Sequence, residues 1–337
     1  NISDEDMPLL LLGGGSNLLL TKDFNGTVLH SAIKGISSTF IDGGVLVRCG
    51  SGETWDDVVA HCVAHGWYGT ENLSLIPGEV GASAVQNIGA YGAEVKDIIY
   101  KVEAVEIATG KSCYFTNEQC EYAYRKSRFK EDWKNKYLIT HVTYKLSLVF
   151  NPHLAVGDRM NTADIRNAVL KVRAAKGMLE DAHRYASPAM QGTKKTNLVD
   201  VALESQSKQN GDDGPDFNRH SCGSFFMNPM VSKDKFNELL KKYPQMPHYD
   251  VALPGGGQGV KTSAAWLIDH AGFHKGFKIN ENAPAGLSTL HTLALTNRGG
   301  ASAEDIARLA KTVQDGVEAA FGIRLVPEPV VIGMNLK

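Results

Sequence analysis

The residues Gly13 to Asn17 read Gly-Gly-Gly-Ser-Asn and form the first segment whose composition suits ligand chemistry. Three consecutive glycines let the backbone take positive φ and turn several N–H groups toward an anion, and the serine and asparagine add side-chain donors. The apolar runs on either side resemble strands, so the segment lacks the helix start of the dinucleotide fingerprint GxGxxG. Two interpretations stay open, an anion cradle and a tight hairpin turn.

A second segment, Pro77 to Gly92, combines many small residues with the amides of Gln86 and Asn87. Small side chains allow a flat ligand to lie close to the backbone, while amides and free N–H groups can bond the edge of a heterocycle or a phosphate. The alternative is a helix of small residues packed closely against its neighbour. The composition alone does not decide between these two structures.

Two further segments carry side chains that could do chemistry. Residues 124–130, Tyr-Arg-Lys-Ser-Arg-Phe-Lys, place four cations in seven positions, which suits either a phosphate or carboxylate site or a solvated basic loop. Ser224 lies in an aromatic stretch, residues 222–229, without the GxSxG elbow that surrounds a hydrolase nucleophile. We therefore do not expect a serine hydrolase.

Two histidine pairs, His61 with His65 and His270 with His274, are spaced four residues apart, as two metal ligands on one helix face would be. Neither pair has a clear third ligand, and the chain contains no HExxH pattern. We therefore expect surface or packing histidines at both places, and no metal site.

Hydrophobic periodicity and turn residues predict the elements that position these segments, in a mixed α+β arrangement. The expected strands are residues 9–12, 18–20, 27–33, 45–50, 99–107, 112–115, 223–227, 290–296 and 325–332. The expected helices are residues 54–64, 163–178, 233–242 and 302–321. Two more helices are expected, one after a capping box formed by Thr116 and Gln119 and one that begins near Thr262. Ser232 can cap the helix at 233. Prolines on both sides of Glu328 predict an irregular or edge strand that fixes this carboxylate.

The composition is that of a folded protein of two or three domains. The chain has 337 residues, of which 43% are hydrophobic and 21% charged. Its net charge of −2 gives no overall positive charge that would indicate binding to nucleic acid or to an acidic membrane. Five scattered cysteines favour reduced thiols, and no apolar run approaches membrane-spanning length, so we expect a cytoplasmic protein. A polar stretch over 179–220 lacks periodicity and is expected to be an insertion.

Six motifs occur in one order along the chain. They are GGGSN at Gly13, PGEVGASAVQNIGAYG at Pro77, YRKSRFK at Tyr124, GSFFMNP at Gly223, AAWLID at Ala264 and PEP at Pro327. Each is weak alone, but together, in this order and with compatible spacing, they resemble the UDP-N-acetylenolpyruvoylglucosamine reductase family over nearly the whole chain. The resemblance is to the subfamily with a longer substrate-covering loop.

The resemblance implies an α+β fold with FAD bound as in vanillyl-alcohol-oxidase or PCMH-type flavoproteins, in two subdomains, plus a C-terminal α+β substrate-binding domain. We expect the first FAD-binding subdomain at 1–33, completed by 323–337, and the second at 34–178. The substrate-binding domain is expected at 221–322. We also expect a monomer.

The resemblance also implies the reaction. NADPH first reduces the FAD, and the nucleotide sugar UDP-N-acetylglucosamine-enolpyruvate then enters the same cleft and is reduced to UDP-N-acetylmuramate, a peptidoglycan precursor. Three catalytic residues match the family pattern. Ser224 is the proton donor, Arg125 holds charge on the substrate carboxylate, and Glu328 helps to polarise the enolpyruvyl group or to position its proton relay.

By the same resemblance, two sets of binding residues are expected. The FAD-binding set is Gly13, Gly14, Gly15, Ser16, Asn17, Leu18, Pro77, Gly81, Ala82, Ser83, Gln86, Asn87, Gly89 and Arg125. The set that contacts the substrate or NADPH is Tyr91, Arg173, Lys176, Asn228, Tyr249, Lys275 and His291. Lys176 and Asn228 could also stabilise the alkoxide of Ser224.

The chain departs from the family pattern at several points. Only residues 1–8 precede the first apolar run, Val156 stands where this subfamily usually has tyrosine in the covering loop, and Met227 replaces a usual lysine. Two alternatives stay open: a flavin oxidase or dehydrogenase of the same FAD-binding superfamily with another substrate, and a nucleotide-sugar-binding protein that has lost catalysis.

Overall fold

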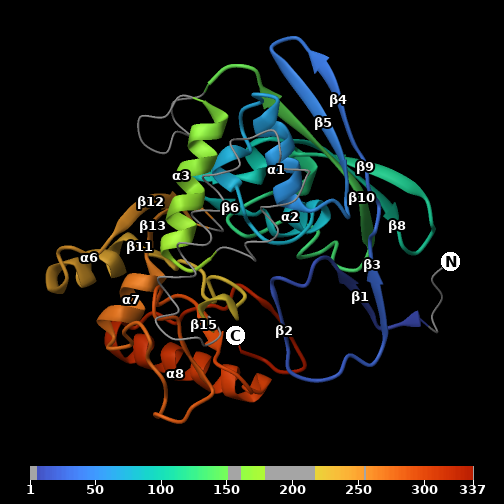
Figure 1. Ribbon diagram of the computed structural model, residues 1–337. Helices are drawn as coiled ribbons and strands as arrows, with labels where there is room; N and C mark the ends of the chain where they lie inside the picture. Colours follow the sequence, from blue (N-terminus) through green and yellow to red (C-terminus); the bar gives the residue numbers. More distant parts are fainter. Residues whose placement is uncertain (1–5, 151–160, 179–216, 254–255, 337) are drawn as a thin grey trace. The chain divides into compact units, whose positions relative to one another are not determined.

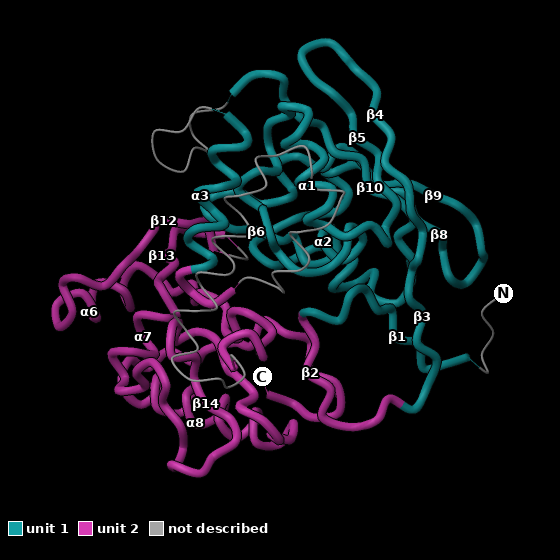
Figure 2. Tube along the Cα trace, viewed as in Figure 1, with its two compact units in different colours: residues 1–16, 25–174, 181–204 teal, residues 17–24, 175–180, 205–337 magenta. Residues whose placement is uncertain are grey.

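The computed structural model describes residues 6–150, 161–178, 217–253 and 256–336. Val156 of the expected covering loop and most of the expected insertion, residues 179–216, lie outside the described residues. The chain forms two compact units (Figure 2). Unit 1 comprises residues 1–16, 25–174 and 181–204, and unit 2 comprises residues 17–24, 175–180 and 205–337.

Unit 1 is built on an antiparallel five-stranded sheet with the order β4-β5-β10-β8-β9. Its strands are β4 (Ile36–Ile41), β5 (Gly44–Gly50), β8 (Ile99–Glu106), β9 (Ser112–Thr116) and β10 (Tyr137–Ser147). The antiparallel pairing of β8 with β9 confirms the hairpin expected at this place. Two short pairs complete the strands of unit 1: parallel β1 (Leu9–Leu12) with β3 (Thr27–His30), and antiparallel β6 (Gly89–Ala90) with β7 (Ala93–Glu94).

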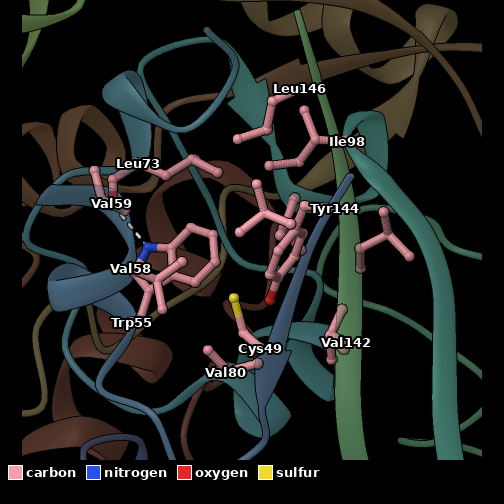
Figure 3. Close-up of a cluster of buried hydrophobic side chains, with 14 of the residues drawn as sticks. Cys49, Trp55, Val58, Val59, Leu73, Val80, Ile98, Val142, Tyr144 and Leu146 are labelled. Carbon is pink, nitrogen blue, oxygen red and sulfur yellow. Dashed lines mark hydrogen bonds between the residues drawn. The ribbon is translucent and has the colours of Figure 1, made fainter. Parts of the chain in front are cut away.

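Helices α1 (Trp55–Ala64), α2 (Val80–Gln86) and α3 (Thr162–Ala175) belong to the same unit (Figure 1). The core between the sheet and α1 is apolar and fully buried, with Trp55 meeting Tyr144 of β10 edge to face at 5.5 Å between ring centroids (Figure 3). Aromatic pairs favour this geometry, and their large buried surface dominates the stability of such a core. The core therefore fixes α1 firmly on the sheet.

The described residues of unit 2 form two small antiparallel sheets and three α-helices. The strands are β11 (Met230–Ser232), β12 (His248–Ala252) and β13 (Gln258–Thr262) in one sheet, and β14 (Ala285–Leu287) and β15 (Leu295–Asn297) in the other. The helices are α6 (Lys233–Lys242), α7 (Ala264–His270) and α8 (Ala303–Phe321). Strand β2 (Leu18–Leu20) pairs in parallel with β16 (Val330–Ile332), so the last strand joins one of the first.

The hairpin interpretation of Gly13 to Asn17 is wrong. The strand before these residues, β1, pairs with β3, and the strand after them, β2, pairs with β16. Because two strands of a hairpin must pair with each other, the glycine segment is a connection between two separate parallel ladders. It is called the glycine loop below.

Most expected helices form where the periodicity placed them. Ser232 caps α6 by accepting the N–H of Lys235, and α8 covers all but the first residue of the expected helix. The box of Thr116 and Gln119 forms with both reciprocal bonds, but only a 3₁₀ turn follows it. The helix expected near Thr262 begins at Ala264.

Three strand expectations need correction. Residues 223–227 are not a strand, because their backbone bonds go to two loops, at Leu293 and at Val326 to Glu328. The strands expected over 290–296 and 325–332 shorten to β15 and β16. Among the described helices, none is both long and apolar enough to cross a membrane.

Candidate functional site

The glycine loop contacts the turn that begins at Pro77. A Cβ added to Gly14 would lie 3.5 Å from the Cα of Gly78, and one added to Gly13 would lie 3.1 Å from the Cβ of Ala82. The hydroxyl of Ser16 donates to the carbonyl of Pro77 over 3.2 Å. The two glycine-rich segments singled out in the sequence therefore meet, at a place where larger side chains would force them apart.

A histidine and a carboxylate connect the same two segments. Leu12 pairs with His30 across the parallel ladder, and the Nε2 of His30 lies 2.9 and 3.0 Å from the two carboxylate oxygens of Glu79. Glu79 directly precedes α2 and would contact a Cβ on Gly13 at 3.5 Å. Sequence analysis did not indicate this pair, because His30 lies outside the six motifs and Glu79, although it lies in the second motif, was assigned no role.

Helix α2 is closely packed, as one of the two interpretations of its composition required. A Cβ on Gly81 would lie 3.0 Å from the Cβ of Ser51, whose carbonyl accepts the N–H of Gly81. The hydroxyl of Ser83 donates to Val80 and lies 3.1 Å from the hydroxyl of Tyr144 inside the core. The side chain of Ser83 therefore faces the protein, and this helix offers a ligand its remaining surface and backbone.

Arg125 is bound to the loop that follows α2. Its Nη2 donates to the carbonyl of Gly89 over 2.7 Å and its Nη1 to that of Asn87 over 3.3 Å. The Nζ of Lys130 donates to the side-chain oxygen of Gln86 over 2.7 Å. The structure thus brings the basic cluster of residues 124–130 to the amides of the second segment. This contact favours a phosphate or carboxylate site over a solvated basic loop.

Asn87 uses its side chain inside the protein. It is fully buried, its Nδ2 donates to the carbonyl of Ala123 over 2.7 Å and to Glu94 over 3.2 Å, and its Oδ1 accepts the N–H of Lys96. Its backbone takes the left-handed conformation that ends α2. Asn87 therefore shapes the loop at which Arg125 is bound, and its contribution to a ligand would come from the backbone.

Tyr91 and Arg173 form a second pair within unit 1. The guanidinium carbon of Arg173 lies 5.8 Å from the centre of the Tyr91 ring, and Arg173 is buried near the end of α3. Burial raises the pKa of the Tyr91 hydroxyl, and this effect is larger than the opposite effect of the positive charge of Arg173, which lowers the pKa. The ring therefore stays neutral and can donate a hydrogen bond.

In unit 2, backbone bonds bring Ser224 and Glu328 to neighbouring positions. The N–H of Glu328 donates to the carbonyl of Phe225 over 2.8 Å, and the N–H of Met227 donates to Val326 over 2.9 Å. The rings of Phe225 and Phe226 are both 1% exposed and anchor this pairing in the core. Burial, with a smaller effect of the Glu328 charge, raises the pKa of the Cys222 thiol to about 11, so this thiol remains protonated.

A group of cationic and polar side chains also lies in unit 2. Burial, followed by the charges of Lys176 and Lys275, lowers the pKa of His291 to about 4. His291 is therefore a neutral imidazole beside two ammonium groups. This arrangement would favour the binding of an anionic ligand. Asn228 accepts the N–H of Ala264 through its Oδ1 at the start of α7.

Tyr249 lies on β12 and is 70% exposed. The strand register places it directly opposite Lys261 of β13, so the two side chains emerge on one face of the sheet. Sequence reasoning did not select Lys261.

Metal ligation has no support in the part of the chain that the structure describes, which contains no group of three or more potential metal-binding side chains. Both histidine pairs bond their own helices. The Nδ1 of His65 lies 2.8 Å from the carbonyl of His61, and that of His270 lies 2.9 Å from the carbonyl of Trp266.

Comparison with known proteins gives consistent matches over both units. Residues 2–114 match the FAD binding domain family, and residues 215–332 match the C-terminal domain of UDP-N-acetylenolpyruvoylglucosamine reductase. The reductase of that name from Cutibacterium acnes is 41% identical over 98% of this chain and 80% of its own length. The one from Bacteroides fragilis is 41% identical over 95% of this chain and 86% of its own.

A solved structure shows the same fold. The crystal structure of UDP-N-acetylenolpyruvylglucosamine reductase from Thermus caldophilus superposes with a TM-score of 0.53 at 21% identity, covering 96% of this chain and 85% of that one. The cofactor-binding fold and the C-terminal domain expected from the sequence are therefore confirmed. The diphosphate of FAD would fit the glycine loop at Gly15, where φ is 71° and no atom lies within 4 Å of the position that a Cβ would take.

Proposed function

The chain belongs to the UDP-N-acetylenolpyruvoylglucosamine reductase family, and on that premise we propose that it reduces the enolpyruvyl ether of UDP-N-acetylglucosamine-enolpyruvate to UDP-N-acetylmuramate. NADPH is the reductant, FAD is the cofactor, and the product is a precursor of peptidoglycan. The observation that carries this proposal is the 41% identity to a reductase of that name over 98% of the chain.

The proposed FAD-binding residues come from the glycine loop with Leu18, from the segment that begins at Pro77, and from Arg125. The residues that carry this role are Gly13, Gly14, Gly15, Ser16, Asn17, Leu18, Pro77, Gly81, Ala82, Ser83, Gln86, Asn87, Gly89 and Arg125. Backbone N–H groups of the glycine loop bind the diphosphate, since Gly15 has a positive φ of 71° and no atom lies within 4 Å of the position of its missing Cβ. The bound flavin supplies the two-electron reduction chemistry that side chains lack.

Arg125 contacts both the substrate carboxylate and the cofactor. Its bonds to two backbone carbonyls fix the plane of the guanidinium. A positioned cation of this kind stabilises enolate-like charge as it develops beside the carboxylate. The pose of Arg125, rather than its charge alone, is therefore the property that matters for turnover.

Ser224 donates the proton to the carbon next to the substrate carboxylate. A serine is a weak acid, but the enolate-like acceptor is strongly basic, and Lys176 and Asn228 stabilise the alkoxide that remains. Glu328 polarises the enolpyruvyl group or positions the proton relay. The pairing of Glu328 with Phe225 supports this assignment, because it sets both side chains at neighbouring positions of one backbone ladder.

The remaining substrate or NADPH contacts are assigned to Tyr91, Arg173, Tyr249, Lys275 and His291. Their chemistry suits an anionic nucleotide sugar: two cations, a neutral imidazole and two phenols. We further propose that the chain belongs to the subfamily with a longer substrate-covering loop, that it is a cytoplasmic monomer, and that it binds no nucleic acid and no membrane.

The domain division is also proposed. Residues 1–33 with 323–337 form the first FAD-binding subdomain, 34–178 the second, 179–220 an insertion, and 221–322 the substrate-binding domain. The parallel pairing of β2 with β16 supports the return of the chain end to the first subdomain.

One experiment separates this function from its rivals. The purified protein is examined for flavin absorbance, reduced anaerobically with NADPH, and then mixed with the enolpyruvyl nucleotide sugar. Bleaching followed by substrate-dependent recovery of the oxidised spectrum is the expected result. Recovery with oxygen alone would instead indicate an oxidase, and a protein that binds the nucleotide sugar but cannot bind flavin would be a binding protein without catalysis.

A further inference from the structure

A buried ion pair joins α3 to α1 in unit 1. The Nη1 and Nη2 of Arg166 donate to the two carboxylate oxygens of Asp56, each over 2.7 Å, and both side chains are only 4% exposed. The two residues lie 110 positions apart in the sequence. A fully buried pair of this kind adds little net stability compared with apolar side chains of similar volume. Stability alone therefore gives no reason for this pair.

The carboxylate of Asp56 has a third partner. Its Oδ1 also accepts the backbone N–H of Leu75 over 2.5 Å. Leu75 has a φ of 58° and is 2% exposed, so a buried leucine is held in the left-handed region that residues with a Cβ avoid. Such outliers persist only where their surroundings determine them, and they gather at ligand-binding sites.

The strained residue stands at the entrance of the turn that meets the glycine loop. Leu75 precedes Pro77 by two residues, and the turn is tied at both ends to the start of α1. The indole N–H of Trp55 donates to the carbonyl of Leu73 over 2.9 Å, and its backbone N–H donates to that of Gly78 over 3.0 Å (Figure 3 shows the indole bond). Both ends of residues 73–78 are therefore hydrogen-bonded to the first residue of α1.

We propose that Arg166 and Asp56 are positioning residues for the FAD-binding turn. The guanidinium fixes the carboxylate, the carboxylate holds the N–H of Leu75, and the left-handed Leu75 directs Pro77 and Gly78 against the glycine loop. Because the two segments are closely packed, with the Cα of Gly78 only 3.5 Å from the position a Cβ on Gly14 would take, a small change at Leu75 alters the space for the diphosphate. This inference rests on the FAD-binding role proposed for the turn.

Two double variants separate this role from a purely structural one. Asp56→Asn/Arg166→Met and Asp56→Leu/Arg166→Met both remove the buried ion pair, and asparagine and leucine are similar in size. The difference that matters here is that Asn retains an oxygen that can accept the N–H of Leu75, whereas Leu has no acceptor. The measurement is the Kd of the apo-protein for FAD, by titration of flavin fluorescence, with the Tm of each apo-protein recorded beside it.

We expect the Asn/Met variant to bind FAD within about threefold of the unaltered protein, and the Leu/Met variant to bind at least about tenfold more weakly, because the buried N–H of Leu75 loses its acceptor. Equal Kd values for the two variants would overturn the proposal. Failure of the unaltered apo-protein to bind FAD would instead refute the proposed function, so the two failures are distinguishable.

A single variant keeps the proposal testable if the Leu/Met variant does not fold. Arg166→Met is compared with Leu170→Ala, which removes a buried side chain from the same helix but has no part in the contacts of Asp56. For a similar fall in Tm, Arg166→Met should weaken FAD binding about tenfold, because the Asp56 carboxylate keeps its buried charge but loses the guanidinium that orients it, whereas Leu170→Ala should weaken it by less than about twofold. If both variants weaken FAD binding in proportion to their loss of Tm, Arg166 has only a structural role.

Discussion

The backbone N–H of Glu328 donates to the carbonyl of Phe225, and this bond brings Ser224 and Glu328, which lie about a hundred residues apart in the sequence, to neighbouring positions. The buried rings of Phe225 and Phe226 hold one side of this pairing, and Pro327 and Pro329 restrict the other. The positions of Ser224 and Glu328 are therefore fixed by backbone hydrogen bonds. That rigidity makes substitutions at either position interpretable.

Ser224→Ala should keep flavin binding and reduction by NADPH but slow turnover of the enolpyruvyl nucleotide sugar by roughly two to four orders of magnitude. The reason is that only the protonation step needs the hydroxyl. Stopped-flow absorbance measures the two half-reactions separately. Ser232→Ala, which removes only the cap of α6, serves as control and should turn over normally. Full activity of Ser224→Ala would refute the assigned donor.

Arg125→Lys should lower kcat/KM for the nucleotide sugar about a hundredfold, because lysine keeps the charge but cannot reproduce the two bonds to Asn87 and Gly89. Steady-state kinetics measures the effect. Arg128→Ala, in the same basic cluster but bonded to the exposed Asp132, should stay within about twofold. Equal losses in the two variants would mean that general positive charge, and not the pose of Arg125, is required.

His291 should make the protein less stable in mild acid. Its pKa is about 4 in the folded protein and near 6.5 when unfolded, so between these values only the unfolded chain binds the proton. The contribution of His291 to the free energy of unfolding is therefore greatest above pH 6.5. It amounts to about 1 to 3 kcal/mol and is lost as the pH falls toward 4. Urea unfolding of the unaltered protein and of His291→Gln across this range tests it: parallel pH profiles would contradict the lowered pKa.

Gly81→Ala should destabilise the protein by about 1 to 3 kcal/mol and weaken FAD binding, because the new methyl group would lie 3.0 Å from the Cβ of Ser51 and push α2 outward. Gly43→Ala is the matched control. It lies in the β4–β5 turn with a φ of 71° and open space around its Cβ, so it should cost about 1 kcal/mol through its backbone and leave the FAD Kd unchanged. Urea unfolding and FAD titration give both quantities.

Local sequence signals predicted the local structure well. The cap at Ser232 and the periodic residues of α8 specify their helices through contacts a few positions apart, and both helices form at those positions. The family motifs likewise identified the FAD-binding fold and the C-terminal domain. What local signals cannot specify is a partner from a distant part of the chain.

The errors have this common cause. The apolar residues 223–227 suggested a strand, but their apolar character comes from burying Phe225 and Phe226 beside Val326, without a regular sheet. Asp56 and Arg166 resemble ordinary helix-surface charges in the sequence, and only the fold shows that they meet. The contact roles of Ser224, Arg125 and Glu328 came from resemblance, and remain predictions until the variants are measured.

The pairing of β2 with β16 also affects how the protein is made. Thr21 bonds Ile332, 311 residues further along the chain, so the early strand leaves the ribosome long before its partner exists. At about 5–20 residues per second, synthesis of that partner takes roughly 15 to 60 s more. During this interval the apolar residues Leu18 to Leu20 do not have the strand β16 to pair with, so we infer that the nascent chain needs protection there.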